Sequence, residues 1–440
     1  MGKRVAKFGG TSLASAEQIR KCVDIIAAHP DRRFVVVSAP GKRHDSDAKV
    51  TDLLYQLYEQ RGGDYSSILA AIRTRFTQIA DELDVSDKVD FDSEFTEIES
   101  NLTGDAGIDY FASRGEALNA LVIAAHLGWT YVDAADVIRF DETGVFLDEE
   151  TQALLSNTLA QYERAVIPGF YGATASGVVK TFSRGGSDVT GALVARATQS
   201  SVYENWTDVS GILMADPRIV ETPEPIARIS YGALRQLTYL GASVLHENAI
   251  YPVRQVGIPT HIRNTNRPDD PGTWIQSEPF AGGSLEEASP PPPHKIVGLA
   301  GRANCQGLTV RKVQWSGSLG VGAQLLQLFD EARIPVDLIV TGVDSWTFIF
   351  RGDASALKTV MEKIQLLGPD SIDIHPSLAL IGIVATGSVP RAKIATEIFQ
   401  ALSQAGIGVQ VDSAAESMQV VGVDAVRYQD AVRAIYSALV

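Results

Sequence analysis

Residues 4–12 read RVAKFGGTS, and this stretch decides the fold that we predict. Its first half alternates like a short strand, and a helical pattern follows the two glycines. Glycine lets the backbone approach an anion closely, and a helix amino terminus points amide donors at it. A Gly-Gly turn is by itself more often only a turn, and the spacing is not that of a Walker A loop. We interpret Lys7, Gly9 and Gly10 as a candidate phosphate site.

Short β-branched runs alternate with longer helical patterns through the first part of the chain. One such run, residues 34–38, follows a helical pattern near residues 16–28. This order is typical of an α/β fold with a doubly wound, mostly parallel sheet and helices on both faces. The chain then shifts to Gly, Glu and four consecutive prolines, which neither pack a core nor continue a helix. We predict a first domain over residues 1–280, a Gly/Pro-rich linker over 281–294 and a second region over 295–440.

Beyond the linker the chain repeats itself. LFDEARIPV at residues 328–336 matches ALSQAGIGV at residues 401–409, and each copy reads as a helix end that leads into a strand. Each copy then continues into a second strand, at residues 345–350 and 418–423. The pattern predicts two similar βαββ units in tandem, although chance similarity of two helix-strand units remains open.

A second glycine turn, SRGGSD at residues 183–188, follows an expected strand and opens an expected helix. In a doubly wound sheet the loops at the carboxyl ends of neighbouring strands meet at one crevice, so both glycine turns could frame one phosphate chain. Arg184 offers a fork for a carboxylate. Asp188 could hold magnesium or orient Lys7, and a simple helix N-terminal charge explains it equally well. Gly185 and Gly186 join the candidate phosphate site.

Between the glycine turns lies SRGE, residues 113–116, at or inside an apolar helix. Glu116 could bind a substrate ammonium group. It could equally cap the helix or pair with Arg114 on a solvated face, and the sequence alone favours this second interpretation.

Two later stretches indicate the edge of a nucleotide site. NWTDV, residues 205–209, ends an expected strand, and Thr207 and Asp208 could contact adenine or ribose. ADPR, residues 215–218, could bring Arg218 to phosphates, although Asp216-Pro217 alone is ordinary turn chemistry.

Composition excludes several classes of protein. The net charge of −15 disfavours nucleic-acid binding, because no basic stripe exists to displace counterions from phosphates. Cys22 and Cys305 are too far apart to suggest a metal site, and they predict two buried thiols in a reducing compartment. With neither an apolar leader nor a stretch of membrane-spanning length, we expect a cytoplasmic protein without a membrane partner.

Taken together the motifs resemble those of aspartate kinases. KFGGTS (7–12), SRGE (113–116), RGGSD (184–188), WTDV (206–209) and ADPR (215–218) stand in the order seen in that family. GASVLH (241–246) and PGT (271–273) extend the match to the linker, and the repeat resembles a pair of ACT domains. The resemblance implies a catalytic amino-acid-kinase-type domain followed by two regulatory ACT-like βαββαβ units in a monofunctional enzyme.

The resemblance also implies the reaction and its residues. The activity would be ATP-dependent phosphorylation of L-aspartate to 4-phospho-L-aspartate, the first step toward lysine, threonine and methionine, with Mg²⁺ but no assigned direct protein ligand for it. Lys7 and Asp188 would be catalytic, Glu116 would bind the aspartate ammonium, and Arg184 its α-carboxylate. The substrate pocket would add Ser38, Thr51 and Ser187, with Ser38 and Thr51 flanking an irregular loop that closes as a lid. The nucleotide would contact Lys7, Gly9, Gly10, Gly185, Gly186, Thr207, Asp208, Asp216 and Arg218. Ser243 departs from the family, where many relatives have a lysine near the nucleotide.

Regulation is expected in the repeat. The stretch that matches the effector site of lysine-inhibited relatives contains Trp315, Ser318, Val321, Gly322, Val336, Asp337 and Thr341. Asp337 could accept an ammonium group, or it is only a strand-end turn residue. Trp315 and Gly342 differ from lysine-sensitive relatives, so lysine, threonine and no effector all remain open. Paired ACT units usually complete their sheet across a dimer, which predicts a homodimer or a dimer of dimers.

Two alternatives stay open. A related amino-acid kinase, acting on glutamate or acetylglutamate, would share the first domain, but the ACT-like repeat and the SRGE segment argue against it. A catalytically silent amino-acid sensor would not need intact Lys7, Glu116, Arg184 and Asp188.

Overall fold

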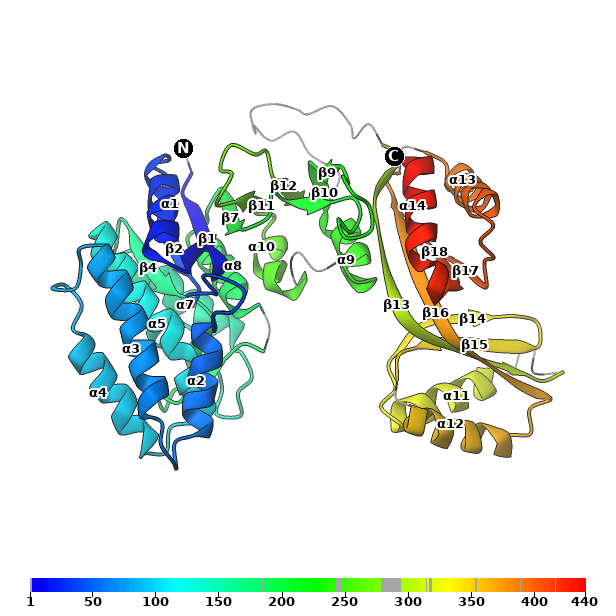
Figure 1. Cartoon of the computed structure of the whole chain (residues 1–440), viewed down its shortest axis with the longest axis horizontal. Coiled ribbons are helices and arrows are strands. Elements are labelled where there is room, and N and C mark those ends of the chain that lie inside the picture. Colours follow the sequence, from blue (N-terminus) through cyan, green and yellow to red (C-terminus); the bar gives the residue numbers. More distant parts are fainter. Residues whose placement is uncertain are drawn as a thin grey trace. The chain divides into compact units, whose positions relative to one another are not determined.

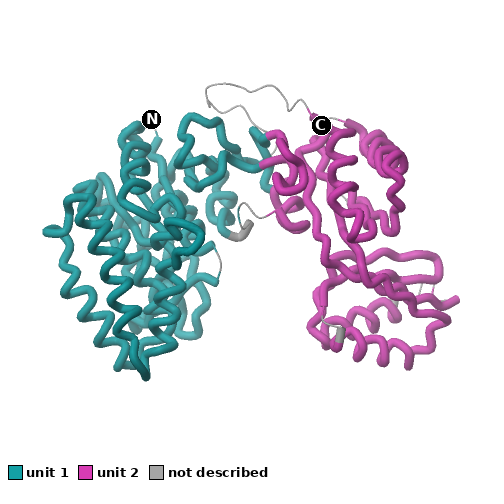
Figure 2. Tube along the Cα trace, in the orientation of Figure 1, with its two compact units in different colours: residues 1–212, 225–231, 244–286 teal, residues 213–224, 232–243, 287–440 magenta. Residues whose placement is uncertain are grey.

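The computed structural model describes residues 2–183, 185–242, 245, 247–277, 294–313, 315, 319–352, 354–387, 389–415 and 417–440. The chain folds into two compact units, coloured separately in Figure 2. Unit 1 contains residues 1–212, 225–231 and 244–286, and unit 2 contains residues 213–224, 232–243 and 287–440. Two short segments from the middle of the chain therefore pack with the C-terminal region. None of the described helices has the length and apolar content that a membrane crossing needs.

Unit 1 is built on an eight-stranded sheet in the order β10-β12-β11-β7-β1-β2-β4-β3. Every pairing in it is parallel except β11 with β12, which confirms the predicted mostly parallel sheet. The strands are β1 (Arg4–Phe8), β2 (Arg32–Val37), β3 (Thr130–Tyr131), β4 (Ala165–Pro168), β7 (Val202–Thr207), β10 (Arg228–Ser230), β11 (Thr260–Asn264) and β12 (Thr273–Gln276). A separate hairpin pairs β5 (Tyr171–Ala173) with β6 (Val179–Thr181).

Helices cover this sheet. They are η1 (Thr11–Leu13), α1 (Ala16–Ala27), α2 (Val50–Glu59), α3 (Ser66–Glu82), α4 (Phe91–Leu102), α5 (Ile108–Leu127), α6 (Ala134–Val137), α7 (Asp148–Leu159), α8 (Gly186–Ala197), η2 (Glu247–Ile250) and α10 (Tyr251–Gln255). Ser15 caps α1 by accepting a hydrogen bond from the backbone of Gln18, and Gly128 ends α5 with a φ of 66°. Figure 1 shows α2 to α5 side by side in the blue and cyan part of the unit.

The alternation along β1 decides where the site lies. Ala6 and Phe8 are fully buried in one core cluster with residues of α1 to α5. Lys7 stands between them, so its side chain points to the opposite face of the sheet, where Asp188 of α8 meets it. A strand buried on both faces therefore presents one lysine among apolar neighbours.

Unit 2 contains a six-stranded antiparallel sheet in the order β14-β15-β13-β16-β18-β17. Its elements are β13 (Ile296–Arg311), α11 (Leu319–Glu331), β14 (Val336–Thr341), β15 (Ser345–Phe350), α12 (Ala354–Leu366), β16 (Ser371–Ala385), α13 (Arg391–Gln404), β17 (Val411–Ala415), β18 (Met418–Asp424), η3 (Ala425–Arg427) and α14 (Tyr428–Leu439). Most of α9 (Tyr231–Tyr239) belongs to this unit, and β8 (Ile212–Leu213) and β9 (Pro225–Ile226) bracket its segment 213–224.

The predicted repeat is present as α11-β14-β15 and α13-β17-β18. The two copies share the long strands β13 and β16, which run through the whole unit in Figure 1. Residues 306–311 of β13 pair with β15, whereas residues 296–302 pair with the second half of β16, which in turn pairs with β18. Strand β15 of the first copy therefore pairs with the C-terminal half of β13, whereas the N-terminal half of β13 belongs to the part of the sheet that holds the second copy. The sequence repeat did not reveal this, because strand pairing joins residues far apart in the chain.

The predicted domain boundary stays a prediction. Most of the predicted linker, residues 281–293, lies outside the described residues. The division into compact units differs from the predicted boundary at two segments, because residues 213–224 and 232–243 belong with the C-terminal region.

Candidate active site

Lys7 meets Asp188 at the carboxyl end of the central strands. Lys7 Nζ lies 2.6 Å from Asp188 Oδ1, and both side chains are mostly buried. Asn205 of β7 donates from Nδ2 to the same carboxylate oxygen at 2.8 Å. Two glycine turns far apart in sequence are therefore brought together, as we expected from the sheet type.

The glycine turn after β1 is tied to both neighbouring strands. The amide of Gly9 donates to the carbonyl of Trp206 at 3.0 Å, and the amide of Gly41 donates to the carbonyl of Gly10 at 2.8 Å. A Cβ on Gly10 would lie 2.9 Å from the carbonyl oxygen of Ala39, which is closer than real contacts allow. The loops after β1 and β2 and the end of β7 thus pack backbone against backbone, and a side chain at Gly10 would push the two loops apart.

The second glycine turn begins α8. Gly185 has a φ of 59°, in the left-handed region that favours glycine, and a Cβ on Gly186 would lie 2.6 Å from the Phe170 ring. Ser187 is buried against Gly169, where a Cβ would again collide. Arg184 lies outside the described residues, so its predicted role stays a prediction.

Glu116 is buried inside α5. Its Oε2 has no hydrogen-bond partner among the described residues. Burial raises the pKa of Glu116 to about 8, against the opposing effects of the Ala39 amide and of Lys7. A buried carboxyl with a vacant oxygen is well suited to meet an ammonium group.

The alternative of a solvated Glu116–Arg114 pair is wrong. Arg114 is itself buried, donates to Ser113 Oγ at 2.9 Å, and lies over the rings of Tyr110 and Tyr171. The sequence favoured a surface pair because it could not show that every face of α5 is covered.

The loop after β2 brings Ser38 to the site. Its amide donates to the Phe8 carbonyl at 3.2 Å, and its carbonyl accepts from Asn119 Nδ2 at 2.8 Å. Residues 40–49 are irregular, as expected, and Thr51 lies in the first turn of α2, half-buried.

Four residues that hold this site together were not predicted from the sequence. Asn205 stood in a quoted motif but was given no role. Asn119 shares a face of α5 with Glu116, three residues away. Asp47 pairs with Arg75 at 2.8 Å. An arginine in the apolar stripe of α3, between Ile72 and Ile79, was the available signal.

Thr207 is the last residue of β7, and Asp208 follows it. Thr207 Oγ1 donates to Asp208 Oδ1 at 3.2 Å, and Asn264 donates to the carbonyl of Asp208 at 3.3 Å. Both side chains stand at the same end of the sheet as Gly9, whose amide binds the residue before Thr207. Their predicted contacts with the nucleotide remain a prediction.

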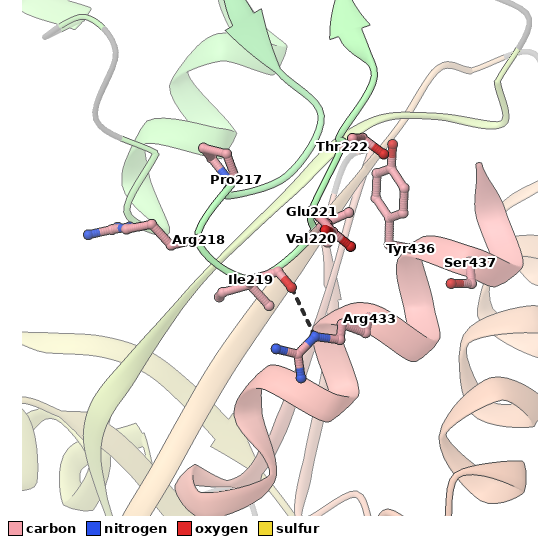
Figure 3. A pocket seen from close by; sticks show the side chains of 9 residues that line it. All are labelled: Pro217, Arg218, Ile219, Val220, Glu221, Thr222, Arg433, Tyr436 and Ser437. Carbon is pink, nitrogen blue, oxygen red and sulfur yellow. Dashed lines mark hydrogen bonds between the residues drawn. The ribbon is translucent and has the colours of Figure 1, made fainter.

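Asp216 and Arg218 belong to unit 2. They pair at 2.6 Å, with Arg218 largely exposed, and Arg218 holds the pKa of Asp216 below its usual range. The segment beside them borders a groove of about 580 Å³, shown in Figure 3, in which Arg433 of α14 donates to the Ile219 carbonyl at 2.9 Å. Tyr436 of the same helix accepts at its hydroxyl from the amide of Glu224 at 2.8 Å.

The expected effector stretch is also in unit 2. Asp337 is almost fully buried and accepts from Arg302 at 3.0 Å and from Arg351 at 2.8 and 3.1 Å. A Cβ on Gly322 would collide with the Trp346 ring. Trp315, Val321 and Val336 pack against the same apolar cluster, and Thr341 is exposed, whereas Ser318 lies outside the described residues.

Two further expectations concern cysteines and metal. Cys22 and Cys305 are both buried and free, as predicted. Within the described part of the chain, no group of three or more His, Cys, Asp or Glu side chains is arranged to hold a metal ion. Ser243, the position noted above as a departure from the family, lies outside the described residues.

Comparison with known proteins places this geometry in a family. Residues 2–264 match the amino acid kinase family. The chain is 32% identical to aspartokinase 3 of Bacillus subtilis over 98% of both chains, and 28% identical to lysine-sensitive aspartokinase 3 of Escherichia coli over 90% of both. The crystal structure of Clostridium acetobutylicum aspartate kinase superposes with a TM-score of 0.89 at 38% identity, covering 100% of both chains. E. coli aspartokinase III in complex with lysine and aspartate gives 0.75 at 25% identity over 99% of both. The chain belongs to the amino acid kinase family and, within it, to the aspartokinases.

Proposed function

We propose that this chain transfers the γ-phosphoryl group of ATP to the side-chain carboxylate of L-aspartate at the site of Lys7, Glu116 and Asp188. Membership of the aspartokinases gives the reaction, and we infer the roles of the individual side chains. The observation that carries them is the buried Lys7–Asp188 pair, 2.6 Å apart, at the meeting point of two glycine turns. The E. coli relative solved with lysine and aspartate supports aspartate as the acceptor.

The chemistry needs no general base. A free aspartate side chain has a pKa of about 3.9 and is ionised at neutral pH. The obstacle is repulsion between this carboxylate and the phosphates of ATP, so catalysis consists of neutralising charge and aligning the reacting groups. The product, 4-phospho-L-aspartate, is an acyl phosphate that starts the biosynthesis of lysine, threonine and methionine.

Lys7 is the positive charge for the phosphates. Asp188 and Asn205 position the Lys7 ammonium group, because Asp188 Oδ1 pairs with Lys7 Nζ and also accepts a hydrogen bond from Asn205 Nδ2. The backbone of Gly9, Gly10, Gly185 and Gly186 lets phosphate oxygens approach without side-chain obstruction.

Magnesium fits this set of donors. Mg²⁺ in kinases typically takes one or two carboxylates together with phosphate oxygens and water, and Asp188 supplies one carboxylate. The ion neutralises phosphate charge when it is bound. Asp188 would then both orient Lys7 and supply the protein carboxylate that holds the ion.

Glu116 binds the α-ammonium group of aspartate. Its vacant Oε2 and its buried position make an ammonium a favourable partner, because a buried carboxylate without a cation is costly. Arg184 would take the α-carboxylate, with Ser38, Thr51 and Ser187 around it. Holding both α-groups sets the distance to the reacting carboxylate, and glutamate would place it too far.

The nucleotide and effector roles rest on the motifs. Thr207, Asp208, Asp216 and Arg218 are inferred to contact ATP, and lysine is inferred as the effector, with the lysine-sensitive E. coli relative as support. We also infer a homodimer, since β14 is an edge strand of its sheet with Ile339 and Thr341 exposed.

A hydroxamate assay tests the proposal, because hydroxylamine traps an acyl phosphate. With ATP, Mg²⁺ and L-aspartate we expect steady hydroxamate formation, and with L-glutamate at the same concentration at least about tenfold less. Equal rates with both amino acids would make the chain a less selective amino-acid kinase. No product with either would reject the assignment.

A further inference from the structure

Arg75 is a buried cation on a helix face that is otherwise apolar. It lies on α3 beside Ile72, Phe76 and Ile79, and only 6% of it is exposed. A guanidinium in such a place is costly unless its donors find partners. The hydrogen-bond partners of the Arg75 guanidinium therefore indicate the role of this residue.

The guanidinium joins two loops that α3 does not belong to. Its Nη2 donates to the carbonyls of Ala14 and Gly41, each at 2.8 Å, and its Nη1 donates to Asp47 Oδ2 at 2.8 Å. Ala14 ends the glycine turn after β1, and Gly41 and Asp47 lie in the loop after β2. We call residues 7–14 the phosphate loop and residues 38–51 the substrate loop.

The two loops also touch directly. The amide of Gly41 donates to the carbonyl of Gly10, and a Cβ on Gly41 would lie 2.7 Å from the backbone of Gly10. Together with the hydrogen bond from the Ser38 amide to the Phe8 carbonyl, this contact joins the loops at residues 8–10 and 38–41. The fork of Arg75 adds an anchor on each loop, which fixes their relative position.

The carboxyl group of Asp47 stays ionised, so it remains an anionic partner for the Arg75 guanidinium. Arg43 binds Asp47 through its backbone amide and its guanidinium, and together with Arg75 it holds the pKa of Asp47 well below its usual range. The substrate loop therefore folds around one carboxylate that two arginines share. Among the described residues the Nε of Arg75 has no partner, so the position is not the best one for stability alone.

We propose that Arg75 is a positioning residue for phosphoryl transfer, which locks the phosphate loop to the substrate loop. Through this lock Lys7 and the residues that hold aspartate keep one relative position. The inference rests on the proposed function of the two loops. A misplacement of about 1 Å between reacting groups can cost about 10²-fold in rate, so turnover should suffer more than binding.

The test compares two arginines of the same helix. Arg75→Met removes the lock, Arg75→Lys keeps the charge without the fork, and Asp47→Asn weakens the anchor in the substrate loop. Arg73→Met is the control, since Arg73 is half-exposed and pairs with Asp92 away from both loops. For each variant kcat, both KM values and the melting temperature would be measured on the full chain.

We expect kcat to fall about 100-fold in Arg75→Met and by less in Arg75→Lys and Asp47→Asn, with KM values changed less than about threefold. The control should match the parent chain. A folded Arg75→Met protein with parent kcat would overturn the proposal. If that variant does not fold, Arg75→Lys and Asp47→Asn decide by the same criterion.

Amide hydrogen exchange separates this proposal from the proposed function. Loss of the lock should speed exchange in residues 10–14 and 41–50 and leave α4 unchanged, whether or not the reaction is aspartate phosphorylation. A lower kcat with unchanged exchange in both loops would reject the lock. Absence of hydroxamate from the parent chain would instead reject the proposed function and leave the exchange result standing.

Discussion

Each unit of this protein has a mostly buried carboxylate paired with at least one basic side chain, and the two clusters differ in the number of cations that the carboxylate binds. In unit 1, Asp188 meets one lysine and one amide beside loops of glycine. In unit 2, Asp337 receives three hydrogen bonds from two guanidiniums and is nearly sealed from solvent. The first cluster has one lysine with the bare backbone of Gly9 beside it, whereas the carboxylate of the second is already taken up by two guanidiniums.

This difference separates a reaction site from a structural cross-link. Lys7 has neighbours without side chains, so an anion can approach it by the backbone. Arg302 comes from β13 and Arg351 follows β15, so Asp337 of β14 ties three strands of the sheet. An effector ammonium could bind Asp337 only by displacing a guanidinium, and Arg351, the more exposed of the two, is the one that could move.

The largest effect should come from removing the lysine of the Lys7–Asp188 cluster. Lys7→Ala removes the cation for the phosphates, and we expect kcat to fall about 10³-fold with the fold retained. Lys3→Ala, an exposed lysine beside the same strand, is the control. Steady-state kinetics and circular dichroism measure both. Turnover within about tenfold of the parent would show that Lys7 is not the phosphate cation.

The second effect should fall on stability. Asp337→Ala leaves two guanidiniums facing each other without their carboxylate, and we expect unit 2 to lose about 2 kcal/mol. Urea unfolding followed by tryptophan fluorescence measures the change, and the hydroxamate assay without effector should stay within about threefold of the parent. A large loss of basal turnover with unchanged stability would contradict the closed, structural character of the cluster.

A third prediction concerns pH. The pKa of Glu116 is raised to about 8, mainly by burial, so the carboxyl is largely protonated at neutral pH in the free protein. Binding an ammonium requires the ionised form, so KM for aspartate should fall as pH rises from about 6.5 to 8, by up to about tenfold per unit, and then level off. Glu116→Gln should raise KM and remove this pH dependence. A parent KM that is flat across this range would show that Glu116 does not bind the ammonium group.

The smallest effect should appear at the groove of unit 2. Tyr436→Phe removes the hydroxyl that accepts from the Glu224 amide, and the cost should be about 1 kcal/mol, seen as faster amide exchange in residues 214–224. Ser437→Ala alters the same groove without that bond and serves as the control. Equal exchange in both variants would mean that this hydroxyl does not anchor the segment.

Much of the Lys7–Asp188 cluster could be predicted from local sequence patterns. Strand-glycine-helix order located Lys7 and Asp188, because backbone conformation and helix termini follow from nearby residues. Glu116 was located but misjudged, since the sequence does not show which helix faces are covered. The apolar stripe of α3 marks Arg75 as unusual, but its role was not recognised, because two of its three partners are the carbonyls of Ala14 and Gly41, and carbonyls have no signature in a sequence.

The amino-acid sequence by itself determined the parallel sheet, the two glycine turns with their charged neighbours, and a repeated helix-strand-strand unit. Only the tertiary structure decided that the repeats share two long strands, that residues 213–224 pack with the C-terminal region, and that one arginine joins two loops. The physical reason is the distance along the chain over which each kind of interaction acts. Periodicity and turn chemistry act over a few residues, while burial, strand pairing and side-chain to backbone hydrogen bonds depend on which distant segments the fold brings together.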